Sequence, residues 1–206
     1  MWYTDSNNYF KLNKLKMTKK GLISIIATVQ EDGGIGIGND HQWDFSENAR
    51  NWMNITKGSA YFMGRKTYEI QEEKCNISAF MMDGRILKII TGQGRGFPIA
   101  KGAYRMPSVK DAIDCVLKHN PGKDIFIAGG QGVYEEAFGN LLDLVNRIHL
   151  TRVDSIKEGA THFLPVYEPT DLKALGFSLI EGGGDFIEAK RGIDKGVMYR
   201  NEVWSR

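Results

Sequence analysis

The sequence lacks the features that would cross-link a fold covalently or carry it into a membrane. Its 206 residues include two cysteines, Cys75 and Cys115, which are too few and too far apart for a disulfide framework or a zinc site. No apolar run approaches the roughly 20 residues that span a bilayer, and no apolar stretch of a secretory signal is present. These absences indicate a cytoplasmic protein with reduced cysteines, no bound metal and no membrane contact.

The sequence also has no large excess of positive or negative charge. The chain has 27 Lys and Arg against 25 Asp and Glu, a formal net charge of +2, which gives no overall electrostatic surface for nucleic acid. With 42% hydrophobic and 25% charged residues, and without repeats, low-complexity tracts or an internal linker, the chain is expected to form one globular domain. We expect that domain at 21–206.

The first twenty residues differ from the rest. They carry five lysines, at positions 11, 14, 16, 19 and 20, against the single acid Asp5, and they show no sustained apolar period. We expect residues 1–20 to form a disordered basic extension. A basic arm that contacts RNA or an anionic lipid is the alternative interpretation.

Strand and helix patterns alternate along the remaining chain. Apolar runs predict buried strands at 21–29, 86–91 and 124–128, and two further strands are expected at 60–63 and 148–153. Helices are expected at 47–57 with Ser46 as N-cap, after Gly64, at 109–119 with Ser108 as N-cap, and after Gly130. The last forty residues alternate and contain turn glycines, which predicts antiparallel strands. The fold class is therefore α/β, with a mainly parallel central sheet, flanking helices and a C-terminal antiparallel hairpin.

Two junctions between a strand and a helix have the character of phosphate sites. At the first, Gly129, Gly130 and Gly132 open a helix whose backbone N–H groups can hold an anion. At the second, 64–67, a glycine is followed by two cations and a threonine hydroxyl. Each motif alone also fits an ordinary turn or a solvated helix start, and neither is a G-x-G-x-x-G fingerprint. Together they favour a dinucleotide.

A third motif, 35–53, joins a glycine-rich segment to a helix. The segment 31–40 has four glycines in ten residues and predicts a flexible loop. Trp43 follows it, and Trp52 lies on the apolar face of the next helix. Periodicity alone would assign Trp52 to the core.

These motifs occur in the order found in dihydrofolate reductases, and the chain from 21 to 206 resembles that family. The matching segments are IIATV, IGIGND with Trp43, MGRKTYE, Gly84-Arg85 before ILKIIT, IAGGQGVYEEAF, and IHLTRVD with EGATHF. The resemblance implies an eight-stranded sheet with four helices, NADPH as hydride donor and reduction of 7,8-dihydrofolate to tetrahydrofolate. It also implies binding of folate analogues such as methotrexate, by a monomer or a weak homodimer.

Site residues are carried over from the resemblance position by position. Those implied to contact the pterin or to act in catalysis are Ile26, Ala27, Trp43, Asn48, Trp52, Met53 and Thr151, with Arg85 on the α-carboxylate of the glutamate tail. Those implied to hold the cofactor are Thr28, Ile35, Gly36, Asn39, Gly64, Arg65, Lys66, Thr67, Thr91, Gly92, Ala128, Gly129, Gly130, Gly132, Val133 and Tyr134. The loop 34–40 would be a mobile lid.

The chain departs from the family pattern at its most important position. Asn48 stands where the family has a carboxylate that accepts two hydrogen bonds from the pterin and favours its protonation at N5. Glu47 is adjacent, but one residue rotates a side chain by about 100° around a helix. It would reach the same point only if the helix began one residue later. Gln42 replaces the usual proline before Trp43, and Ala160 stands where many members have an acid.

Three functions therefore remain open from the sequence. The first is a dihydrofolate reductase with an altered acid site, and Arg85 favours it over reduction of a pyrimidine without a tail. The second is a reductase of the same fold that acts on another pterin or pyrimidine. The third is a catalytically silent protein that binds NADPH or folate. Arg65 and Lys66 favour NADPH over NADH, whereas Gly92 and Gly132 offer nothing to a 2′-phosphate.

Overall fold

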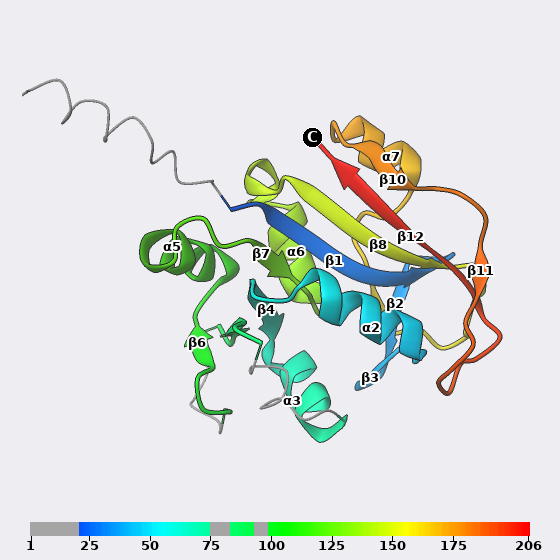
Figure 1. Ribbon diagram of the computed structural model, residues 1–206, viewed down its shortest axis with the longest axis horizontal. Helices are drawn as coiled ribbons and strands as arrows, with labels where there is room; N and C mark the ends of the chain where they lie inside the picture. The colour runs from blue at the N-terminus through cyan, green and yellow to red at the C-terminus, as the bar shows by residue number, and fades with distance from the viewer. Residues whose placement is uncertain (1–20, 75–82, 93–98) are drawn as a thin grey trace, which may run out of the picture.

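The computed structural model describes residues 21–74, 83–92 and 99–206, so the expectations for 1–20 and for Cys75 lie outside the described residues. A twisted sheet runs through the molecule (Figure 1) in the strand order β10-β12-β8-β1-β7-β4-β5-β6, with β11 paired to β12. The strands are β1 (Ile23–Gln30), β4 (Ala60–Gly64), β5 (Ile86–Ile90), β6 (Tyr104–Met106), β7 (Ile125–Ile127), β8 (Arg147–Val153), β10 (Ser178–Gly182), β11 (Ile187–Glu188) and β12 (Met198–Ser205).

The predicted fold class is confirmed. All neighbours from β8 through β1, β7, β4 and β5 to β6 pair in parallel, whereas β12 is antiparallel to β8, β10 and β11. The path has eight strands, the number that the resemblance implies, and the short β11 is a ninth strand in the described part of the chain. The described part of the chain has five α-helices rather than four: α2 (Ser46–Ile55), α3 (Arg65–Lys74), α5 (Val109–His119), α6 (Gln131–Phe138) and α7 (Pro169–Ala174).

One predicted helix start is confirmed and one is wrong. Ser108 caps α5, because its hydroxyl accepts the backbone N–H of Asp111 at 3.0 Å. Ser46 was expected to cap α2 but is its first residue, and the N-cap is the extended Phe45. Phe45 is held by packing instead, since it is 1% exposed and lies 4.7 Å from the ring of Tyr199.

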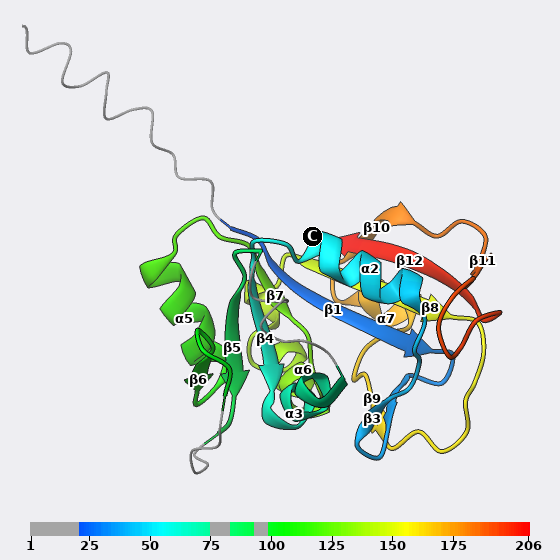
Figure 2. The same ribbon diagram turned by 60° about the horizontal axis from the view of Figure 1, so that its bottom comes forward.

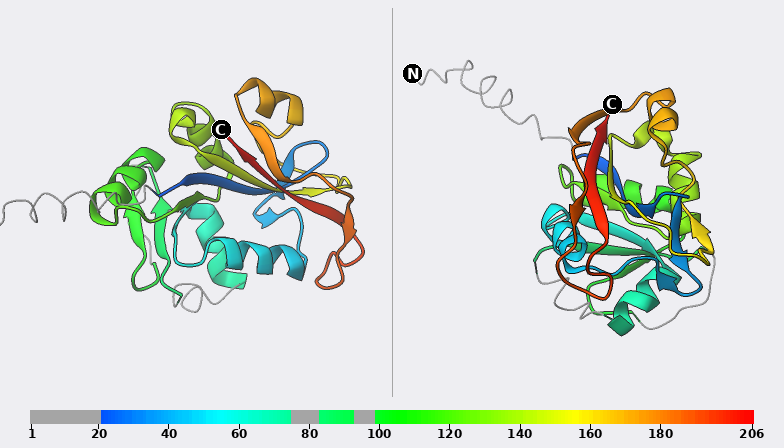
Figure 3. Two further views of the ribbon diagram at one scale, coloured as in Figure 1. Left: turned by 45° about the horizontal axis from the view of Figure 1, so that its top comes forward. Right: turned by 90° about the vertical axis from the view of Figure 1, so that its right-hand side faces the viewer.

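The sheet separates two cores, because alternate side chains of a strand leave opposite faces. Ile25 and Ala27 of β1 belong to the larger core, which α5, α6 and α7 cover. Ile26 belongs to the smaller core under α2 and α3. Figure 2 shows α2 lying along β1, and Figure 3 (left) shows α2 in cyan and α7 in orange on opposite sides of the sheet. The site described below lies on the side of α2 and α3.

The expected loop 31–40 is ordered as part of a second, small sheet. Its strands are β2 (Gly34–Ile37), β3 (Asp40–His41) and β9 (His162–Phe163), in the order β3-β2-β9. The glycines alone predicted a loop because the pairing partner, β9, lies far along the chain. A local sequence pattern contains no information about such a distant partner.

A buried carboxylate joins β8 to β12. The Glu202 side chain is 1% exposed and accepts from Arg152 Nε at 2.7 Å and Arg200 Nε at 2.9 Å. Trp204 Nε1 donates to the same carboxylate at 2.8 Å. Both carboxylate oxygens of Glu202 therefore accept hydrogen bonds, and its negative charge lies between the two guanidinium groups.

We predict that Glu202→Gln lowers the free energy of unfolding by about 3 kcal/mol, because it leaves two partly buried guanidinium groups without their anion. Urea denaturation measures the effect. Glu188→Gln is the matched control, since Glu188 pairs with Lys190 at the surface of β11, and it should cost less than about 1 kcal/mol. Equal losses in the two variants would contradict the role given to Glu202.

A histidine of β8, His149, is partly buried against an aromatic ring. Burial, with a smaller contribution from the charge of Arg147, lowers the pKa of His149 from 6.5 to about 4. Its ring packs 5.5 Å from that of Phe126. Since the folded pKa lies below the unfolded one, His149 must be neutral in the native state. Its contribution to stability is present above pH 6.5 and is lost as the pH falls toward 4.

We therefore expect the free energy of unfolding to drop by up to about 3 kcal/mol between pH 6.5 and pH 4 because of this residue. In His149→Gln the pH dependence over that window should be flatter. Chemical denaturation at several pH values, with NMR titration of the ring, tests it. A His149 ring that titrates near pH 6.5 in the native protein would refute the argument.

Candidate active site

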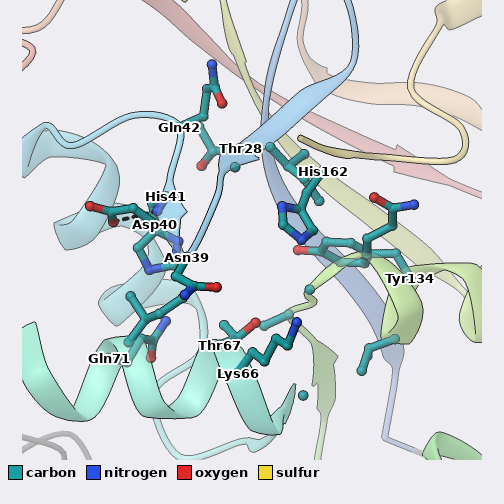
Figure 4. Close-up of a pocket in the computed structure, with 18 of the residues that line it drawn as sticks. Thr28, Asn39, Asp40, His41, Gln42, Lys66, Thr67, Gln71, Tyr134 and His162 are labelled. Atoms are coloured by element: carbon teal, nitrogen blue, oxygen red, sulfur yellow. Dashed lines mark hydrogen bonds between the residues drawn. The ribbon is translucent and has the colours of Figure 1, made fainter. Parts of the chain in front are cut away.

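A cavity of about 980 Å³ opens near the ends of β1, β4 and β7, between α2, α3 and the start of α6. Ligands of open parallel sheets bind outside the carboxyl ends of the strands, which is where this cavity lies. Thr28 from β1, Lys66 and Thr67 from α3, and Tyr134 from α6 surround the same space in Figure 4. This cavity is the candidate active site.

Most residues that the sequence assigns to the site line the cavity. They are Thr28, Ile35, Gly36, Asn39, Trp43, Asn48, Trp52, Met53, Gly64, Arg65, Lys66, Thr67, Ala128, Gly130, Gly132, Val133 and Tyr134. These residues come from distant parts of the chain, and the fold brings them to one place.

Eight assigned residues lie outside the lining, namely Ile26, Ala27, Glu47, Arg85, Thr91, Gly92, Gly129 and Thr151. Ile26 is 1% exposed in the core beneath α2, and Ala27 faces the opposite side of the sheet. Thr151 is 2% exposed, and its hydroxyl donates to Asn201 Oδ1 at 2.9 Å. Burial along β1 therefore keeps Ile26 and Ala27 out of the lining, and the hydrogen bond to β12 keeps Thr151 out of it.

Asn48 presents a neutral amide to the cavity from the first turn of α2. Its Nδ2 donates to Thr28 Oγ1 at 2.8 Å, while its Oδ1 is buried and has no hydrogen-bond partner among the described residues. Trp52, one turn further along α2, likewise has a buried Nε1 for which the described chain supplies no acceptor. Buried polar atoms are normally paired. A ligand with one N–H and one acceptor would satisfy both.

Glu47 is directed away from this cavity. Its Oε1 accepts the backbone N–H of Lys190 at 3.1 Å. Burial acts to raise the pKa of the Glu47 carboxyl, but the backbone N–H groups of Glu47, Lys190 and Arg191 together hold that pKa below its usual range. Glu47 could take the place of Asn48 only in a helix that began one residue later than expected. α2 begins at Ser46, so this alternative does not occur.

The two predicted phosphate turns lie side by side. Gly64 N, at the end of β4, donates to Gly129 O at 2.7 Å. Gly129 has a φ of +90°, and a Cβ on it would come within 2.6 Å of the Tyr134 ring, so only glycine fits there. A Cβ on Gly130 would lie 3.1 Å from Thr67 Oγ1. The first turns of α3 and α6, whose N–H groups lack partners within the helix, therefore meet at one narrow place.

Arg65 and Lys66 add positive charge beside these helix starts. Both are exposed and line the cavity, and Arg65 Nε lies 3.3 Å from Glu69 Oε1 on the same helix. N–H groups at helix starts, a hydroxyl and two cations are the donors that bind phosphate groups. The residues present thus fit a dinucleotide.

Gln42 and Trp43 join the segment before α2 to the chain beyond β8. Gln42 Nε2 donates to the carbonyl of Lys157 at 2.6 Å, and Trp43 Nε1 donates to Gln30 Oε1 at 3.2 Å. Gln30 Oε1 also accepts the backbone N–H of Lys157, at 3.0 Å. Gln30 and Gln42 are 1% and 2% exposed, so this polar network is shielded from water. It fixes the indole at the cavity wall.

Sequence reasoning missed several lining residues, among them His41, Tyr61, Ile70, Gln71, Lys74 and His162. Those on α3 could have been found, because Ile70 and Lys74 follow Lys66 at the spacing of one helical turn. Lys74 forms an ion pair with Asp40 of β3, which links α3 to the small sheet. No local signal identifies His162, since the pairing of β9 with β2 brings it to the cavity.

Within 21–74, 83–92 and 99–206, every helix falls short of the length and apolar character that a membrane crossing requires. In the same ranges, no three His, Cys, Asp or Glu side chains gather in a way that could hold a metal ion.

Comparison with known proteins agrees with this geometry. Residues 22–176 match the family model described as dihydrofolate reductase. A dihydrofolate reductase of Drosophila melanogaster is 29% identical over 137 residues, which are 63% of this chain and 72% of that protein. One of Bacillus subtilis is 25% identical over 152 residues, 74% of this chain and 80% of that protein. A bifunctional dihydrofolate reductase-thymidylate synthase of Paramecium tetraurelia is 26% identical over 137 residues, and the match covers 27% of its length.

The family match covers most of the chain, and the cavity unites the motifs that suggested the resemblance. The chain belongs to the dihydrofolate reductase family, a family of oxidoreductases.

Proposed function

We propose that the protein reduces the dihydropterin ring of 7,8-dihydrofolate to the tetrahydro form with NADPH. One observation carries the proposal: a single cavity has Asn48 and Trp52 on one wall and the paired glycine turns on the other. The first wall suits a flat ring with N–H groups, and the second suits a dinucleotide. NADPH, when bound, supplies the hydride. We assign its phosphates to Arg65, Lys66, Thr67 and the turn at Gly130.

Asn48 is proposed to orient the pterin. Because Thr28 Oγ1 accepts one amide hydrogen, the free Oδ1 of Asn48 is the acceptor for a ring N–H. The Trp52 indole lies one turn away and borders the same ring, with its Nε1 as donor. A neutral amide supplies one acceptor where a carboxylate would supply two. It fixes the position of the ring but cannot attract a proton to N5.

The proton for N5 is therefore proposed to come from solvent. Asn48 does not titrate, and Glu47 is engaged with the backbone of Lys190 outside the cavity. The rate of reduction should then rise as the pH falls, with no plateau set by a buried carboxyl. A silent binding protein is the second candidate, and the absence of an acid at position 48 is the observation that favours it.

The expectations about domain organisation, location, oligomeric state and inhibitor binding are also proposals. We propose that residues 21–206 form one domain, that the protein acts in the cytoplasm as a monomer or weak dimer, and that folate analogues such as methotrexate occupy the same cavity.

We predict that Asn48→Asp raises kcat/KM for dihydrofolate at pH 7 by about 10²–10⁴-fold, the usual contribution of a positioned acid or base. The Thr28 hydroxyl, which accepts from the Asn48 amide in the wild-type protein, would instead donate to the new carboxylate. Stability should fall slightly, since a half-buried carboxylate is desolvated at a greater cost than an amide. NADPH oxidation followed from pH 5 to pH 8 measures the rate.

Glu47→Gln distinguishes the two neighbouring residues. It should leave the pH profile unchanged, because the Glu47 side chain faces the backbone at 190. Loss of activity in Glu47→Gln without a gain in Asn48→Asp would assign the acid to Glu47. No reduction by any of these proteins would favour the silent binder.

We further predict that Lys66→Ala weakens NADPH binding by about 1.5–3 kcal/mol and NADH binding by much less, as expected for a charged contact to the 2′-phosphate. Fluorescence titration with both cofactors tests it. Lys57→Ala, a change of the same kind at an exposed position beyond α2, serves as control. If both cofactors lose affinity equally, Lys66 contacts the pyrophosphate or nothing.

A further inference from the structure

A lysine, a cysteine and a histidine lie close together on the side of the sheet that faces away from the cavity. Lys88 belongs to β5, whose Leu87 and Ile89 are in the smaller core, so alternation directs Lys88 to the opposite face. Cys115 and His119 are one turn apart on α5, and α5 packs against β4, β5 and β6 (Figure 2). This cluster therefore lies outside the candidate active site.

Lys88 is a buried cation for which the described residues supply no carboxylate. The residue is 4% exposed. Its Nζ donates to Cys115 Sγ at 3.5 Å and lies 4.0 Å from the centre of the Tyr104 ring. The ring attracts the ammonium group but carries no charge that would neutralise it. Burial of an ammonium group is unfavourable unless an anion accompanies it, and ionisation of the Cys115 thiol supplies one.

The hydrogen bonds around the sulfur atom are those of an acceptor. His119 Nδ1 lies 2.9 Å from the carbonyl oxygen of Cys115, and because a carbonyl oxygen only accepts, this nitrogen carries the proton. The same Nδ1 is 3.7 Å from Cys115 Sγ. Two N–H donors, from Lys88 and His119, therefore converge on the sulfur. Cationic and hydrogen-bonding neighbours of this kind stabilise a thiolate, which is the nucleophilic form of cysteine.

The carboxylates near this part of α5 have other partners. Asp111 accepts from the hydroxyl of Ser108, and Asp114 forms an ion pair with Lys110. Glu136 of α6 accepts the backbone N–H of Lys110 at 3.2 Å. None of these three acids competes with the sulfur atom for the buried ammonium group.

We propose that Cys115 is a site of reversible covalent modification by small disulfides, with Lys88 as the counter-charge of its thiolate. Cys115 is a free cysteine and is partly exposed, so solvent reaches it. The thiolate attacks one sulfur of the small disulfide, whose S–S bond breaks as the mixed disulfide forms. The other half of the reagent leaves as a thiolate, so one disulfide and one thiolate are present before and after the exchange. This inference does not depend on the proposed function.

Alkylation by iodoacetamide tests whether the sulfur is activated. The reagent is uncharged, so Lys88 does not attract it. The full-length protein with Cys75→Ser retains one thiol, and intact mass follows its reaction at pH 7. Because an ordinary cysteine is only a few per cent ionised at this pH, we expect Cys115 to react about tenfold faster than free glutathione. A rate equal to or below that of glutathione would overturn the proposal.

Lys88→Met tests the cause of the activation. It should slow the alkylation about tenfold, as expected when a hydrogen bond to a charged group is lost, and Lys88→Arg should restore part of the rate. Lys173→Met, which removes an exposed lysine of α7, is the matched control and should leave the rate unchanged. Equal rates in Lys88→Met and its parent would refute the role of Lys88. Thermal denaturation verifies that each variant is folded, and the comparison with glutathione needs none of them.

Oxidised glutathione tests the modification itself. We expect the protein with Cys75→Ser to gain one glutathionyl group that dithiothreitol removes, and the protein that also carries Cys115→Ser to gain none. Since the mixed disulfide leaves Lys88 buried without an anion, the adduct should unfold at a lower urea concentration than the free protein. Lys88→Met should abolish this difference. No adduct at Cys115, or an adduct as stable as the free protein, would contradict the inference.

Discussion

The central position of β1 is the constraint on which the rest of the structure depends. β1 pairs in parallel with β7 on one side and β8 on the other, so that Thr28 lies beside Thr151. Alternation then sends Ala27 into the larger core and Thr28 to the cavity, where it accepts from Asn48. A slip of one residue would exchange the two faces and remove the partner that orients Asn48. The fold and the candidate site are thus fixed by the same register.

The sequence was sufficient for features that depend on local pattern. Largely apolar runs identified β1, β4, β5 and β7, because strands buried on both faces are mostly apolar. The turns at 64 and at 129–130 were found because glycine is needed where two backbone segments approach each other closely. The position of Asn48 in the site came from the resemblance instead, and the residue lies in the first turn of α2 and lines the cavity.

Features that depend on a distant or competing partner could not be predicted. The segment 34–41 forms strands only because β9 pairs with it, and Glu47 turns outward only because the backbone at 190 offers a donor. The start of α2 shifts for a related reason: the chain at Gly192 passes so close that a Cβ there would lie 2.6 Å from Phe45 Cα. Arg85 is the clearest case, since the sequence gives no sign that Asp83, two residues earlier, forms an ion pair with its guanidinium.

Taken together, these contacts distribute charge unevenly over the cavity. At the end near α2, Asn48 presents an uncharged amide, and Arg85 is paired with Asp83. The end near α3 keeps Arg65 and Lys66 exposed to solvent. Attraction between exposed charges is screened by salt, whereas hydrogen bonds and apolar contacts in a shielded pocket are affected much less. Under the proposed function, the two halves of the site therefore use different physics: shape and single hydrogen bonds for the flat ring, and electrostatic attraction for the phosphates. Under the proposed function, a ring that meets no charged side chain at Asn48 is still held there by the unpaired Asn48 Oδ1 and Trp52 Nε1 of the described chain.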